Sequence, residues 1–114
     1  MMAKIVYVDQ EDGKRRVMDN KKLYARLLTK FKDETRIEPI FAALDAGNYE
    51  EAQGLAHTLK GVTANLSIIG LHAKVVELEA QIKARSVKPK TVKAVKTVFA
   101  QTLPELERVI EENG

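Results

Sequence analysis

The chain has 114 residues and a formal net charge of +3, with 45% hydrophobic residues, 31% charged residues and no cysteine. This apolar content is enough for one core, and the lack of cysteine excludes disulfides and thiolate metal sites. The apolar run over residues 1–8 is too short for a signal-peptide core or a membrane span. We therefore expect residues 1–114 to be a single domain of a cytoplasmic protein.

The hydrophobic pattern has a helical period along most of the chain. Asp9 is placed to cap a first short helix to about Met18, and the β-branched run before it is compatible with a brief extended segment. A long helix is predicted over residues 20–46, with a kink at Pro39 because proline removes a backbone donor and clashes with the preceding turn. Gly47 suits the end of this helix.

Three more helices are predicted after Gly47. Asn48 and Glu51 form a capping-box-like start for the first of them. The next is predicted from Ser67, a good N-cap residue, to about Arg85. Its narrow apolar seam consists of Ile68, Leu71, Val75, Leu78 and Ile82.

The last helix is predicted to begin near residues 88–90, with Pro89 in its first turn and a kink or interruption at Pro104. Long amphipathic helices with short connections are typical of helical bundles. We predict an all-α fold: an antiparallel four-helix bundle with an additional short N-terminal helix as a lid.

His57 is the residue with the most informative surroundings. On a helix it falls off the apolar face and is exposed. A lone exposed histidine is usually a solvated surface residue. Here, however, two glycines lie one turn away in the helix interior, where each costs about 1 kcal/mol, which indicates that a partner approaches the ring closely. The neighbours on this side are Gln53, Gly54, Lys60, Gly61 and Ala64.

Residues 45–66 resemble the core of the histidine-containing phosphotransfer (HPt) family. Its pattern is His-x-x-Lys-Gly, followed by small residues and often by Asn-Leu, and the matching residues here are His57, Lys60, Gly61, Asn65 and Leu66. A looser resemblance covers residues 8–85, with a Tyr-x-x-Leu-Leu-x-x-Phe pattern beginning at Tyr24. The chain departs from the family at Ser67, where many members have glycine, and at Val62, where alanine or serine is frequent.

The resemblance implies a phosphocarrier that bears a phosphoryl group on His57 and passes it between receiver-domain aspartates. Lys60 would neutralise the phosphoryl oxygens, while Gly61, Gly54 and Ala64 would let the partner reach the ring, with Gln53 and Ile68 at the docking rim. The implied partners are response-regulator receiver domains and a hybrid histidine kinase. Mg²⁺ is expected on the receiver, and no cofactor on this chain, which we expect to be a monomer.

Other chemistries have less support in the sequence. His72 has no second ligand at metal-binding spacing, so we expect a structural or surface role for it and no metal site. Residues 83–96 are basic, but no aromatic residue is interleaved for base stacking, and an acidic stretch follows at Glu105, Glu107, Glu111 and Glu112, so we expect a solvated surface rather than nucleic-acid binding. Steering of an acidic partner, such as the receiver domain that the resemblance implies, is the alternative.

Two alternatives to the phosphocarrier remain. One is a helical adaptor that docks a receiver domain without carrying phosphate. The other is the phosphoacceptor domain of a self-sufficient kinase. No glycine-rich phosphate loop or nucleotide-binding fingerprint is present, so we predict that the chain has no kinase activity of its own.

Overall fold

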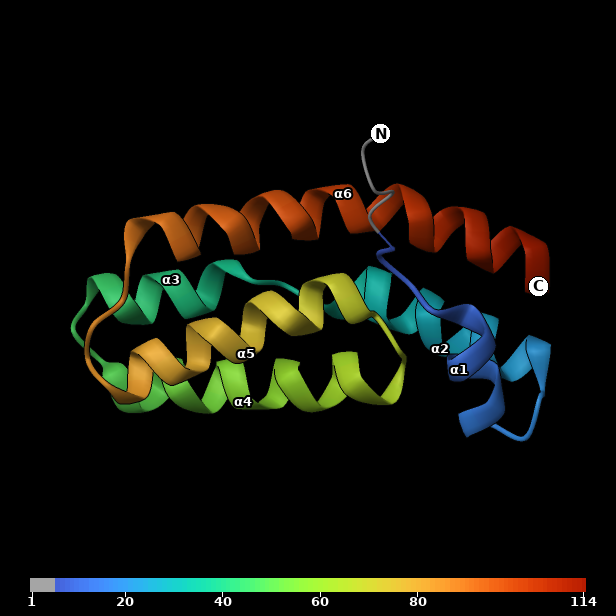
Figure 1. Ribbon diagram of the computed structural model, residues 1–114, viewed down its shortest axis with the longest axis horizontal. Coiled ribbons are helices and arrows are strands. Elements are labelled where there is room, and N and C mark those ends of the chain that lie inside the picture. The colour runs from blue at the N-terminus through green and yellow to red at the C-terminus, as the bar shows by residue number, and fades with distance from the viewer. Residues whose placement is uncertain (1–5) are drawn as a thin grey trace.

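The computed structural model describes residues 6–114, and all regular structure in that range is helical. The helices are α1 (Gln10–Arg16), α2 (Lys21–Glu34), α3 (Glu38–Asp45), α4 (Tyr49–Asn65), α5 (Ile69–Lys83) and α6 (Pro89–Asn113). Figure 1 shows α3 continuing along the direction of α2, so that α2–α3, α4, α5 and α6 alternate in direction. The predicted all-α bundle with an additional short N-terminal helix is confirmed.

The start of the chain agrees with the first predicted cap. Asp9 accepts a hydrogen bond from the backbone of Asp12 at the start of α1. Of the β-branched run before Asp9, for which an extended segment was considered, Ile5 lies outside the described residues, and residues 6–9 form neither helix nor strand. None of the helices in residues 6–114 combines the length and the apolar character needed to cross a bilayer.

The helix predicted over residues 20–46 is in fact two helices. α2 ends at Glu34, and Thr35 has extended backbone angles (φ −79°, ψ 131°). Pro39 lies in the first turn of α3 instead of at a kink. The prediction of one bent helix was wrong because a helix's first N–H groups have no intrahelical acceptor, so a proline there fits a start as well as a bend.

α6 runs from Pro89 to Asn113 without interruption at Pro104. Figure 1 shows this helix changing direction in its C-terminal part. Proline therefore bends the helix here without ending it, because neighbouring turns keep their own hydrogen bonds and the packing against α2 and α5 holds both halves. Pro89 occupies the first turn, as predicted.

Two predicted caps after α3 have different outcomes. Asn48 accepts a hydrogen bond from the Glu51 backbone, which confirms the start of α4. Ser67 was predicted to cap the next helix, but Ile68 holds that position. Ser67 instead has a left-handed backbone (φ 56°), and its hydroxyl donates to Asp12 at 2.6 Å. The prediction was wrong because Ser67 takes a left-handed turn conformation one residue before the cap position, and its hydroxyl is directed to Asp12 on α1.

The packing of α4 against α5 places the residues discussed below. The buried stripe of α4 is made of small and medium side chains, and that of α5 of larger apolar ones; the residues are Ala52, Ala56, Leu59 and Thr63 on α4, and Leu71, Val75, Leu78 and Ile82 on α5. Alanines in the contact allow the two helices to approach closely. The flank of α4 that borders this buried stripe therefore lies directly beside α5, and we call it the outer flank of α4.

The short helix α1 covers the turn between α4 and α5. The backbone N–H of Asp9 donates to the Ser67 carbonyl at 2.9 Å. The buried Tyr24 hydroxyl of α2 donates to the Leu66 carbonyl at 2.8 Å. α1, α2 and the α4–α5 turn are thereby held together at the end of the bundle away from the α5–α6 connection (Figure 1).

Candidate functional site

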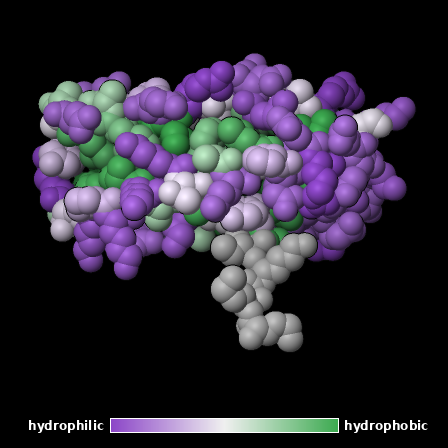
Figure 2. Space-filling view, turned by 90° about the horizontal axis from the view of Figure 1, so that it is seen from above, coloured by the Kyte–Doolittle hydropathy of each residue, from purple (hydrophilic) through white to green (hydrophobic). Residues whose placement is uncertain are grey.

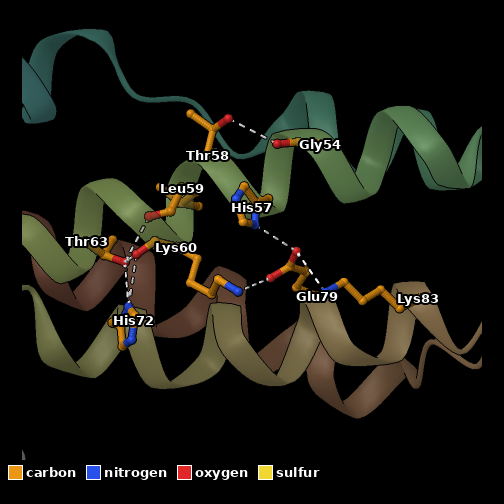
Figure 3. Close-up of polar contacts among 9 residues, drawn as sticks. All are labelled: Gly54, His57, Thr58, Leu59, Lys60, Thr63, His72, Glu79 and Lys83. Carbon is orange, nitrogen blue, oxygen red and sulfur yellow. Dashed lines mark hydrogen bonds and ion pairs between the residues drawn. The ribbon is translucent and has the colours of Figure 1, made fainter.

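His57 lies on the outer flank of α4 and is the exposed member of a polar cluster between α4 and α5 (Figure 3). Its side chain is 69% exposed. Nδ1 of the ring is 3.2 Å from Oε2 of Glu79 on α5. One edge of an otherwise open imidazole is thus held by a group on the neighbouring helix.

Glu79 is the buried centre of this cluster, with a side chain only 3% exposed. Its Oε1 contacts the ammonium of Lys60, and its Oε2 lies 3.7 Å from Nζ of Lys83. The hydrogen bond from Lys60 lowers the pKa of Glu79 below its ordinary value, and the charges of Lys60 and Lys83 act in the same direction against burial, which raises it. Glu79 is therefore an ionised carboxylate at neutral pH.

An ionised carboxylate can only accept hydrogen bonds, and this property fixes the state of the imidazole. Nδ1 of His57 must carry the proton that is donated to Glu79. In the neutral ring the lone pair is then on Nε2, which points away from Nδ1 and hence away from α5. The cluster presents a nucleophilic nitrogen to the solvent side.

Lys60 reaches the same carboxylate from one helical turn beyond His57. Its side chain is 31% exposed, so the ammonium is in contact with solvent as well as with Glu79. An ammonium has three donors, and the contact with Glu79 uses one of them. Two donors of the Lys60 ammonium are therefore left free while it stays paired with Glu79.

The small residues expected around the ring leave open space there. A Cβ atom added to Gly54 or to Gly61 would meet nothing within 4 Å beyond the helix's own neighbouring backbone. Neither glycine is required by packing against another helix. Ala64 is partly buried on the same helix, as is Gln53, which also borders a hollow with Lys83 and Arg85.

Ile68 does not lie at a docking rim. Its side chain is 0% exposed and belongs to the core. The prediction was wrong because Ile68 caps α5 with its side chain turned inward, and the next residue, Ile69, is the exposed one.

His72 has a structural contact, in line with the sequence expectation. Its Nδ1 is 3.1 Å from the Lys60 carbonyl and 3.2 Å from Oγ1 of Thr63 (Figure 3). The ring is half-buried between α4 and α5. His72 thus bonds the backbone of α4 one turn beyond His57 and does not face the His57 ring.

Glu79 and the position of Lys83 beside it are not among the site residues predicted from the sequence. Glu79 lies four residues after Val75 and three before Ile82, so it shares their buried face. A carboxylate on an apolar seam is seldom buried without a partner, and that pattern was the available signal. Its partners could not be read from the pattern, because they depend on how α4 lies against α5.

Within residues 6–114, no group of three or more histidine and carboxylate side chains is placed to hold a metal ion.

Comparison with known proteins gives one match. A family model described as Hpt domain matches residues 26–112. No curated protein and no solved structure matches the chain. The matched residues include all of α3, α4 and α5, and therefore the whole polar cluster around Glu79.

Proposed function

The chain belongs to the Hpt domain family, and we propose that it carries a phosphoryl group on His57 between receiver-domain aspartates of a two-component phosphorelay. Members of this family are phosphocarrier modules that interact with receiver domains and kinases. We further propose that residues 1–114 act as one such module and as a monomer.

The observation that carries this proposal is the orientation of the His57 ring. Nδ1 of His57 donates to Oε2 of Glu79 at an N···O distance of 3.2 Å, and the His57 side chain is 69% exposed. The nucleophilic Nε2 is therefore fixed in direction and accessible to another protein. Fixing a nucleophile in direction is most of what phosphoryl transfer requires, because its transition state is loose and little covalent assistance is needed.

The transfer step needs no proton movement on this chain. The Nε2 lone pair of His57 forms a bond to phosphorus while the bond from phosphorus to the aspartate oxygen breaks, and the carboxylate leaves with that electron pair. The ring keeps its Nδ1 proton and gains positive charge. Glu79, whose carboxylate is already in place, stabilises this charge, as a preorganised group does without rearrangement. Onward transfer to a second aspartate is the reverse of this step.

The cations around Glu79 would balance the phosphoryl group itself. Lys60 contacts Glu79 from the solvent side, and Lys83 lies 3.7 Å from the same carboxylate. Both ammonium groups are partly exposed, so either can turn a free donor towards phosphoryl oxygens at Nε2. The open space at Gly54 and Gly61 would admit the loops of a folded partner.

The partner would supply the remaining chemistry. In this proposal the receiver domain provides the aspartyl phosphate and the Mg²⁺, a hybrid histidine kinase loads the relay, and this chain needs no cofactor and has no kinase activity of its own. A receiver-docking adaptor that carries no phosphate is the second candidate. The fixed Nε2 favours the phosphocarrier, because docking alone does not require an oriented nucleophile.

The proposal is tested by incubating the protein with phosphorylated receiver domains. Wild type is expected to take up phosphate, and His57→Gln is expected to take up none while keeping its helical content, since exposed substitutions change stability by only about 0.5 kcal/mol. The matched control is His72→Gln, which should still be phosphorylated. Phosphate uptake by His57→Gln would refute the proposal, and labelling of wild type by ATP alone would support a kinase instead.

A further inference from the structure

Six exposed cations follow one another from the end of α5 into α6, with no acidic residue between them in the sequence. We call this set the basic track; its members are Lys83, Arg85, Lys88, Lys90, Lys93 and Lys96. The α5–α6 connection brings them together at one end of the bundle (Figure 1). The net charge of only +3 hides this concentration.

Most cations of the basic track have no ion pair among residues 6–114, as is also the case for Lys21, Lys22 and Arg26 on α2. At the opposite end, Arg16 is 2.9 Å from Asp12, and Arg108 is 2.7 Å from both Glu105 and Glu112. Within residues 6–114, Lys83 is the one member of the track that has an ion pair, through Glu79. The positive charge of the track is therefore not cancelled by adjacent carboxylates.

Some cations of the basic track contact aromatic rings or border an apolar groove. Arg85 lies over the Tyr49 ring and Lys96 over the Phe41 ring, at 4.9 and 4.8 Å from the ring centres. Lys93 and Lys96 also border an apolar groove between α3 and α6, lined by Phe41, Leu44, Asp45, Val87, Pro89 and Val92. Figure 2, which looks onto α6, shows apolar surface at this end between hydrophilic side chains. These contacts fix two of the cations in place.

The basic track begins at the His57 site. Lys83 touches the carboxylate that holds the His57 ring. Arg85 and Lys83 then border one hollow with Gln53, which is one helical turn before His57, and with Glu50. Exposed cations thus follow one another along the chain from Lys83, beside the ring, to Lys96 on α6, and the carboxylates of Glu50 and Asp45 border the hollows at the two ends of the track.

We propose that the basic track steers an acidic receiver domain towards His57 by long-range attraction. This inference rests on the proposed function. A domain that phosphorylates an aspartate with Mg²⁺ must gather carboxylates to bind the ion, so its reactive face is acidic. A surface of one sign raises the rate of encounter with an oppositely charged partner by about 10- to 1,000-fold, and the effect falls with ionic strength.

Duplex nucleic acid is the other anionic macromolecule that such a track would attract. The two aromatic rings at the track lie under Arg85 and Lys96, so neither presents a free face for stacking on this side. The track also runs into the His57 site instead of along a separate face. Both observations favour the receiver.

The test compares two variants that change the net charge equally. In the first, Lys88, Lys90 and Lys93 are each changed to Glu; none of them contacts Glu79. In the control, the exposed residues Lys21, Lys22 and Arg26 at the start of α2 are each changed to Glu. The second-order rate of transfer from a phosphorylated receiver is measured from low to high salt, together with labelling of His57 by phosphoramidate.

The track variant is expected to transfer at least about tenfold more slowly at low salt, with the difference disappearing at about 0.5 M salt, while the control stays near wild type. Equal losses in both variants, no loss in either, or a loss that salt does not change would overturn the proposal. So would a track variant that loses binding to a duplex oligonucleotide but transfers normally. Unchanged melting temperatures exclude misfolding, and replacement of the three lysines by Gln should give an intermediate loss.

Phosphoramidate separates this inference from the proposed function. Because it is small and weakly charged, it should label wild type and both variants alike at His57. Failure to label wild type would refute the phosphocarrier itself, whereas normal labelling with unchanged receiver kinetics would refute only the steering.

Discussion

At the scale of single residues, Glu79 decides how the site is arranged. It is buried on the seam of α5, yet each of its oxygens has a cationic or imidazole partner. All of those partners reach solvent, with side chains between 31% and 69% exposed. The carboxylate thus depends on its partners to stay ionised, whereas the partners do not depend on it for solvation.

This asymmetry predicts different stabilities for two variants. Lys60→Ala removes the largest stabilising contact of a buried carboxylate, and we expect it to lower the free energy of unfolding by about 1–3 kcal/mol. Glu79→Leu leaves no buried charge behind, and we expect a change within about 1 kcal/mol. Urea denaturation measures both. Both variants should transfer phosphate more slowly, and a larger destabilisation by Glu79→Leu than by Lys60→Ala would contradict the assignment.

The same carboxylate predicts a pH dependence. The pKa of Glu79 lies below its ordinary value of 4.5 in the folded protein. A lowered native pKa stabilises the fold above the unfolded value, and this stabilisation is lost as pH falls through the native value. The unfolding free energy of wild type minus that of Glu79→Leu should therefore decrease as pH falls below 4.5. A difference that grew on acidification would mean that the carboxyl group is protonated in the native state.

At the scale of elements, His57 lies on α4, a helix with two interior glycines, Gly54 and Gly61. No packing contact requires a glycine at either position. Thr58 and Thr63 bond back to carbonyls of the preceding turn, at 3.1 Å to Gly54 and 2.9 Å to Leu59. The helix is nevertheless continuous from Tyr49 to Asn65. Its length and straight course keep His57, Lys60 and the open space at Gly61 on one flank.

Gly61→Gln separates access from chemistry. Because a Cβ at this position meets nothing within 4 Å, the variant should be equal to wild type in stability or up to about 1 kcal/mol more stable. It should nevertheless block transfer from a receiver, while phosphoramidate still labels His57. Ala100→Gln on the exposed side of α6 is the control for added bulk. Normal receiver transfer by Gly61→Gln would show that the partner does not approach over this turn.

The turn between α4 and α5 allows a second test at this scale. Ser67 has a left-handed backbone, and its hydroxyl donates to Asp12. Ser67→Ala and Ser67→Gly both lose that hydrogen bond, but only alanine keeps a Cβ in the strained conformation. We expect the glycine variant to be more stable than the alanine variant by about 1 kcal/mol in urea denaturation. Equal stabilities would show that the turn relaxes to another backbone conformation.

At the scale of the whole molecule, the features that can be predicted from the sequence are those set by neighbouring residues, such as helix positions and helix starts. The 3.6-residue period and the caps at Asp9 and Asn48 placed the helices and the fold class correctly. They failed at Thr35, where the chain breaks although the apolar period continues, and at Ser67, whose acceptor lies on α1. The first failure concerns a proline that suits a helix start as well as a bend, and the second a contact with a distant segment; the apolar period contains neither.

In the candidate site, too, the features set by one helix could be predicted from the sequence, and those set by packing between helices could not. The exposure of His57 follows from its place off the apolar face of α4, and the structure agrees. The buried state of Ile68 and the contact of Glu79 with the His57 ring depend on the packing of α5 against α4. A sequence pattern places residues on a face of one helix, but it does not state which residue of the next helix lies opposite.

The central claim is that His57 accepts phosphate on Nε2 while Glu79 holds the Nδ1 proton. The most direct measurement is NMR of the ¹⁵N-labelled protein after phosphoramidate treatment, with the imidazole nitrogens followed by long-range ¹H–¹⁵N correlation and the phosphorus by ³¹P spectra. We predict phosphorus on Nε2 of His57 and a protonated Nδ1 in the same ring. Phosphorus on Nδ1 of His57, or on His72, would contradict the account.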